Sequence, residues 1–188
     1  MTALKPPSEK RTAPKARASS IVVSHGGRTG QRPAGVTGVD SSQFRTEATQ
    51  RKALLFARIV SAKHFGGIKA VKLIRDGYPA EILKSASYFF DVPDSRIRVI
   101  VKIPASTASR LEKSNAKIDS AATERVYRMG AVARMAIDVF ENEALAIKWM
   151  RQPNHALGDV APLDLMDTEP GAATVRQVLN AIATGGVA

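Results

Sequence analysis

Apolar side chains recur every three or four residues along most of this chain, with polar residues between them. That spacing gathers the apolar side chains on one face of a helix. It predicts helices over residues 47–65, 68–75 and 79–91, which end at Gly66, at Gly77 and before Pro93. The first half of the chain therefore indicates a helical protein.

Residues 95–101 fit two patterns. Ile97, Val99 and Val101 alternate as in a strand, whereas Ile97, Ile100 and Val101 also fit one face of a helix. A lone strand would have no neighbour to pair with. We therefore predict a helix here as well.

The longest amphipathic stretch begins at Ser120, which suits a helix N-cap. Its apolar positions continue through Phe140, Ala144 and Ile147. They predict a single helix that ends near Trp149.

Three further signals follow this stretch. A turn is predicted around Pro153, a short helix from Pro162, and a last helix that is capped by Thr168 and ends before Gly185. The fold class predicted for the whole chain is all-α.

Residues 1–45 differ in character, since Pro and Gly alternate there with Lys, Arg and Ser without a helical or strand period. They predict a flexible basic tail, which is either a solubilising extension or an arm that adds phosphate contacts. The remainder divides into a helical module over residues 46–120 and a second module over residues 121–188.

Charge separates these regions. The 188 residues carry a net charge of +11, with net +7 in residues 1–52, net +7 in residues 53–140 and net −3 in residues 141–188. The basic excess favours an anionic partner such as nucleic acid. The last segment holds an acidic cluster that predicts a solvated face or a protein-binding surface, formed by Asp159, Asp164, Asp167 and Glu169.

Signals for chemistry are missing from the sequence. There is no Cys and no apolar run long enough to span a bilayer, nor is there a nucleotide-binding, metalloprotease or nucleophile-elbow motif. His25, His64 and His155 have no second ligand at a suitable spacing. We expect no catalytic residue, no metal, no cofactor, no export signal and a cytoplasmic protein.

The segment from Arg96 to Lys113 has the layout of a helix-turn-helix, with Pro104 starting its second helix. Short hydroxyls and a guanidinium on that helix suit base edges and phosphates in a major groove, and Arg110 is the first candidate for a base contact. Two positions depart from the usual pattern, since Arg98 replaces a small residue and Lys102 replaces the turn glycine. The predicted DNA-binding residues are Arg96, Arg98, Lys102, Ser106, Thr107, Ser109, Arg110 and Lys113.

The C-terminal quarter carries a series of residues in characteristic order and spacing, namely Trp149, Pro153, Asn154, Leu157, Gly158, Pro162, Leu163, Gly171, Val175 and Gly185. With the preceding helix-turn-helix, this series resembles the Xre/MbcA/ParS antitoxins over roughly residues 66–188. The resemblance implies a DNA-binding module that represses its own operon. It also implies that the ten residues mark a module that binds a cognate toxin, usually of the NAD-consuming RES type or a related ADP-ribosylating type.

Within that series, Trp149, Leu157, Leu163 and Val175 are expected in the core, together with Leu179. The turn around Asn154 and residues 184–188 are expected to reach the toxin. The resemblance further implies a homodimer that reads palindromic operator DNA and inhibits the toxin by covering its NAD cleft. A stand-alone helix-turn-helix regulator without a toxin is the alternative, and an RNA-binding protein and an enzyme fit less well.

Overall fold

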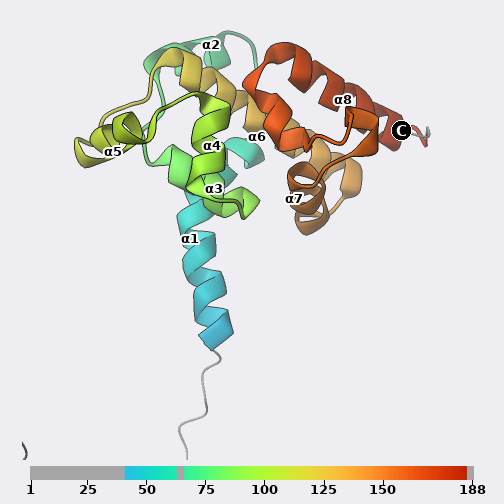
Figure 1. Cartoon of the computed structure of the whole chain (residues 1–188), viewed down its shortest axis with the longest axis horizontal. Helices are drawn as coiled ribbons and strands as arrows, with labels where there is room; N and C mark the ends of the chain where they lie inside the picture. The colour runs from blue at the N-terminus through green and yellow to red at the C-terminus, as the bar shows by residue number, and fades with distance from the viewer. Residues whose placement is uncertain (1–40, 63–65, 186–188) are drawn as a thin grey trace, which may run out of the picture. The chain divides into compact units, whose positions relative to one another are not determined.

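A computed structural model of the chain describes residues 41–62 and 66–185. These residues are helical, with no strand among them beyond two isolated bridges, Pro79 with Lys117 and Asn154 with Val160. The all-α prediction is confirmed (Figure 1). The α-helices and the two 3₁₀ helices (η) are α1 (Ser41–Ser61), α2 (Gly67–Asp76), α3 (Ile82–Phe90), α4 (Asp94–Val101), α5 (Ala105–Lys113), α6 (Ser120–Phe140), α7 (Glu143–Arg151), η1 (His155–Leu157), η2 (Pro162–Asp167) and α8 (Glu169–Ala183).

Helix α6 is the centre of the arrangement and contacts α1, α2, α4, α7, η2 and α8. Val126, Met129, Val132 and Ala136 are fully buried along one face of it, which is the spacing of an amphipathic helix. Helices α5 and α8 lie on opposite sides of α6 (Figure 1). One hydrophobic core runs from α1 to α8. The two modules predicted on either side of residue 120 are therefore not separate in their packing.

Helix α1 begins at Ser41, so the predicted tail boundary at residue 45 falls inside a helix. Residues 1–40, which make up the rest of that tail, lie outside the described residues. The C-terminal half of α1 packs on α3, where the ring of Phe56 lies 5.1 Å from that of Phe89 and 5.3 Å from that of Phe90. These aromatic contacts attach α1 to the core.

The prediction of one long helix from Ser120 to Trp149 is wrong. Helix α6 ends at Phe140, because Glu141 has a left-handed backbone (φ 51°), and a separate helix, α7, begins at Glu143. Asn142 caps α7 by accepting a hydrogen bond from the Leu145 N–H at 3.0 Å. The cap of α6 also differs by one residue from expectation, because Asp119 and not Ser120 accepts the hydrogen bond from Ala122.

The ambiguous residues 95–101 are helical, as predicted, and form most of α4. Lys102 follows in the left-handed conformation (φ 60°), where glycine is the usual residue. Its N–H donates to the Val99 carbonyl, and the Ile103 N–H donates to Arg98. Pro104 then precedes α5, so that α4, the turn and α5 form the expected helix-turn-helix layout.

The C-terminal elements start and stop where the sequence predicts. Pro162 opens η2, and the Thr168 hydroxyl accepts from the Gly171 N–H at 3.2 Å to cap α8. Gly171 is required here because a Cβ at this position would overlap the carbonyl oxygen of Leu165. Gly158 ends η1 with φ 68°, a conformation that other residues rarely adopt.

Candidate functional site

Helix α5 presents the polar face that the helix-turn-helix hypothesis requires. Ser106, Ser109, Arg110 and Lys113 are exposed and line a shallow, open hollow together with Ser114. Ala108, on the opposite side of the helix, is buried in the core. Thr107 is half-buried between these two faces. The Arg110 guanidinium is exposed and makes no ion pair or hydrogen bond within residues 41–62 and 66–185, so it is available to a ligand.

The three predicted phosphate ligands on α4 and its turn are not equivalent. Arg98 is half-exposed, without an ion pair among the described residues. Arg96 instead binds the carboxylate of Asp164 through two nitrogens, at 2.7 and 2.8 Å. Lys102 lies 3.2 Å from the carboxylate of Asp167. Two of the three predicted cations are therefore engaged by η2.

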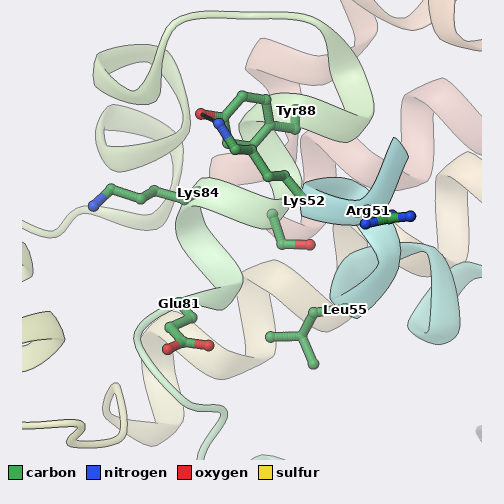
Figure 2. Close-up of a pocket in the computed structure, with 7 residues that line it drawn as sticks. Arg51, Lys52, Leu55, Glu81, Lys84 and Tyr88 are labelled. Atoms are coloured by element: carbon green, nitrogen blue, oxygen red, sulfur yellow. Dashed lines mark hydrogen bonds between the residues drawn. The ribbon is translucent and has the colours of Figure 1, made fainter. Parts of the chain in front are cut away.

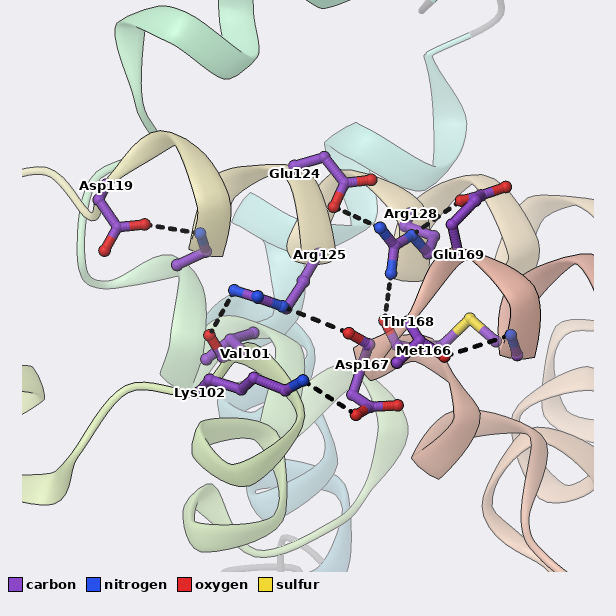
Figure 3. A network of polar contacts seen from close by, with 12 residues as sticks. Val101, Lys102, Asp119, Glu124, Arg125, Arg128, Met166, Asp167, Thr168 and Glu169 are labelled. Atoms are coloured by element: carbon purple, nitrogen blue, oxygen red, sulfur yellow. Dashed lines mark hydrogen bonds and ion pairs between the residues drawn. The ribbon is translucent and has the colours of Figure 1, made fainter.

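Helix α6 contributes two further arginines to the same junction (Figure 3). Arg125 donates to the carbonyl of Val101 at 3.3 Å and to that of Asp167 at 3.4 Å. These bonds connect the end of α4 to the end of η2. The sequence gives no signal for this bridge, since its ends lie 24 and 42 residues from Arg125.

Arg128 is the most buried cation of the junction, with 9% of its side chain exposed. It donates to the Met166 carbonyl at 3.0 Å and pairs with Glu124 at 2.5 Å. Its Nε lies 3.1 Å from a Glu169 oxygen, although the angle there does not meet hydrogen-bond geometry. Such a charge is stable in the interior only when paired in this way.

The acidic cluster of the last quarter is therefore largely ion-paired. Asp164, Asp167 and Glu169 pair with cations of α4, its turn and α6. Asp159 is the most exposed of the four and lies 3.5 Å from the exposed His155. The three paired carboxylates keep 41%, 35% and 60% of their side chains exposed, so they are partly neutralised by cations from distant parts of the chain but remain at the surface.

A second group of cations lines a groove between α1 and α3 (Figure 2). Lys52 lies 4.9 Å above the ring of Tyr88 and 3.3 Å from its hydroxyl. Lys84 pairs with Glu112 of α5, and this hydrogen bond raises the pKa of Lys84 above its ordinary value. Arg51 points away from both lysines (Figure 2). The three cationic side chains of this groove therefore do not point toward a common position at which one anion could bind.

The ten C-terminal signature residues divide by exposure. Leu163 and Val175 are fully buried, and Leu157 is 8% exposed. Trp149 is half-buried against Phe140, with ring centroids 5.7 Å apart. The buried group, completed by Pro162, shapes the core of the module. Leu179 is fully buried as well, as expected.

The remaining signature residues lie at the surface or at turns. Pro153, Gly158 and Gly185 are exposed, and Gly171 is half-buried. The side chain of Asn154 accepts a hydrogen bond from the Ala156 N–H at 2.9 Å and so caps η1. Pro153, Asn154 and Gly158 lie in the turn that joins α7 to η2, whereas Gly171 lies in the first turn of α8 and Gly185 follows that helix.

Two exposed apolar residues of this module were not singled out from the sequence. Leu145 on α7 is 53% exposed and Val160 is 39% exposed. The sequence reading assigned Ala144 and Ile147 to the buried face, whereas α7 buries Ala146 and Met150. The break at Glu141 shifts the helical register, so that Ala146 and Met150 face the core in place of Ala144.

No group of three possible metal-ligating side chains occurs in residues 41–62 and 66–185. None of the described helices is long and apolar enough to cross a lipid bilayer. Tyr78 is the one strongly perturbed group among the described residues, because burial, reinforced by Tyr127, raises its pKa to about 12. It lies in the core.

Comparison with known proteins identifies the C-terminal module. Residues 135–185 match the family described as the antitoxin Xre/MbcA/ParS C-terminal toxin-binding domain. An Antitoxin Xre of Yersinia enterocolitica is 27% identical over 141 residues, or 74% of this chain and 94% of that protein. An Antitoxin Xre of Photorhabdus laumondii is 27% identical over 114 residues, covering 60% of this chain and 77% of that protein.

A third relative, from a Sphingobium species, is named Prs ADP-ribosylating antitoxin. It is 25% identical over 130 residues, which cover 64% of this chain and 82% of that protein. The similarity to these relatives extends well beyond the matched C-terminal domain. Residues 135–185 are therefore similar to the Xre/MbcA/ParS toxin-binding domain, and the chain as a whole is similar to Xre-family antitoxins.

Proposed function

We propose that this chain neutralises a cognate toxin through its C-terminal module and represses its own operon through α4 and α5. The observation that carries the proposal is the match of residues 135–185 to a toxin-binding domain. The chain acts by binding, without catalysis or a cofactor. It works in the cytoplasm as a homodimer.

The proposed toxin is a RES-type enzyme that consumes NAD, with an ADP-ribosylating enzyme as the related possibility. Inhibition occurs by occlusion, in which α7 and the turn over residues 152–160 cover the NAD cleft. The exposed Leu145 and Val160 support this assignment, since they offer apolar surface whose burial under the toxin would favour binding. Pro153 and Asn154 lie in the same turn.

Co-expression with the neighbouring gene tests the first function. We expect the neighbouring protein to co-purify with this chain, and we expect loss of this chain to deplete cellular NAD and arrest growth. If the neighbouring gene is not toxic and its product does not co-purify, the chain is a stand-alone regulator.

The second function is binding of operator DNA by α5 within the major groove. Ser106, Ser109, Arg110 and Lys113 form the exposed face of that helix, and Arg98 is the phosphate ligand on α4 that has no ion pair among the described residues. A dimer would place two such helices about one turn of DNA apart. The net charge of +11 supports an anionic partner.

Arg110→Ala tests this surface. We expect it to weaken operator binding by about 1–3 kcal/mol, as for loss of a bidentate base contact, while toxin binding is unchanged. Lys148→Ala is the matched control, because it removes one positive charge from an exposed position on α7. Equal operator affinity of the Arg110→Ala variant and the wild-type chain would remove Arg110 from the DNA interface.

A further inference from the structure

Two carboxylates of the toxin-binding module engage the helix-turn-helix directly. Asp164 accepts both hydrogen bonds of a fork-shaped contact with Arg96, from Nε at 2.7 Å and from Nη2 at 2.8 Å. The same guanidinium donates to the Arg151 carbonyl through two nitrogens at 3.3 Å. This planar, bidentate geometry fixes the orientation of both partners. It joins α4 to η2 across 68 residues of sequence.

The second carboxylate acts at the turn between α4 and α5. Asp167 lies 3.2 Å from the ammonium of Lys102, whose left-handed backbone forms that turn. The main chain on both sides of this contact is held by Arg125, which donates to the Val101 and Asp167 carbonyls (Figure 3). The first turn of α4 and the turn that follows α4 are thus both attached to η2.

Helix α5, by contrast, packs on few of the other described helices, although Ala108 is buried in the core and Glu112 pairs with Lys84 of α3. Its one substantial helix neighbour in the described structure is α4, and its exposed face carries the DNA-reading side chains. The angle at which α5 meets DNA therefore depends on the placement of α4 and the turn. Recognition helices read base edges only within a narrow range of position.

We propose that Asp164 and Asp167 are positioning residues for operator recognition, acting through Arg96 and Lys102. This inference rests on the proposed operator binding. It gives Arg96 and Lys102 a role in holding α4 and its turn against η2, in place of phosphate contacts.

Simple electrostatics predicts the opposite effect of removing these carboxylates. Loss of negative charge beside a DNA-binding surface raises affinity for any duplex, and freed cations that reach phosphates steepen the dependence on salt. A positioning role instead lowers affinity for the operator alone. The ratio of operator affinity to scrambled-duplex affinity separates the two explanations.

The test uses the full chain with Asp164→Asn and Asp167→Asn combined. The probes are the duplex upstream of its own gene and a scrambled duplex of equal length, each titrated at several salt concentrations. Asp159→Asn is the control, since Asp159 belongs to the same module but its side chain pairs with His155 and with no cation of α4 or its turn. We expect operator affinity to fall at least fivefold in the double variant, scrambled-duplex affinity not to fall, and the control to bind as wild type.

Two results would overturn the inference. Operator binding as tight as wild type, or tighter, would show that the carboxylates do not position the motif. An equal loss on both duplexes, with weaker toxin binding, would show a general structural defect. If the wild-type chain itself does not prefer the operator, the proposed DNA-binding function fails instead.

A charge exchange gives an independent result. The variants are Arg96→Asp, Asp164→Arg and the two combined; the side chains are 28% and 41% exposed, so the exchange buries no new charge. Each single variant is expected to lose operator preference, and the combined variant to regain part of it. A combined variant no better than Arg96→Asp alone would identify Arg96 as a phosphate ligand and contradict the positioning role.

Discussion

Two leucines of the C-terminal module provide a matched pair of substitutions with opposite expected effects. Leu163 in η2 is fully buried, whereas Leu145 on α7 is 53% exposed. A fully buried Leu→Ala change costs about 3–5 kcal/mol. At roughly 2–4 °C per kcal/mol for a protein of this size, Leu163→Ala should lower the melting temperature by about 6–20 °C. Leu145→Ala should change stability by less than about 0.5 kcal/mol.

Toxin binding should show the reverse order. Burying a whole leucine side chain is worth about 1.5–3 kcal/mol, and about half of Leu145 is left to bury. Complete coverage by the toxin would then contribute about 0.8–1.5 kcal/mol, or roughly four- to twelvefold in affinity. We expect Leu145→Ala to bind the toxin about tenfold more weakly, and Leu163→Ala to bind within about twofold of wild type at temperatures where it is folded.

Thermal denaturation followed by circular dichroism and calorimetric titration with toxin measure the two quantities. Wild-type toxin affinity in the Leu145→Ala variant would exclude this face of α7 from the interface. A wild-type melting temperature in the Leu163→Ala variant would contradict its place in the core.

Two further substitutions test the core and the cap of α8. The phenol of Tyr78 has no hydrogen-bond partner among the described residues, and burial raises its pKa to about 12. Because the folded state retains this proton more tightly than the unfolded chain does, the contribution of Tyr78 is complete below about pH 10 and is lost between about pH 10 and 12. Urea unfolding at a series of alkaline pH values should show that the free energy of unfolding falls less steeply with pH in Tyr78→Phe than in the wild-type chain. The same slope against pH in both proteins would refute this. Gly171→Ala should destabilise the chain by more than about 1 kcal/mol in the same assay, because its Cβ would overlap the Leu165 carbonyl; an unchanged unfolding midpoint would show that the cap can shift freely.

Local signals in the sequence predicted most elements of the fold. Apolar spacing predicted the helices, Thr168 and Pro162 set the starts of α8 and η2, and the helical alternative for residues 95–101 is confirmed. The break at Glu141 was missed because the apolar period continues through Phe140, Ala144 and Ile147. The weak signal was Asn142, a good cap with an acidic residue after it.

The candidate site was less predictable, because its key contacts join distant segments. Arg96 and Lys102 have the composition of phosphate ligands, and only the folded chain brings Asp164 and Asp167 to them. Sequence spacing carries no information about such pairs. The C-terminal signature was informative for the opposite reason, since many of its members maintain the local shape of the module, as Gly171 and the buried Leu163 do.

Titration of the purified toxin with this chain, followed by the rate of NAD consumption, tests the central claim most directly. The account predicts that the rate falls to background at a fixed stoichiometry, and that about ten times more of the Leu145→Ala variant is needed when the toxin is dilute relative to the dissociation constant. NAD consumption that continues unchanged at saturating excess of the chain would contradict neutralisation by occlusion.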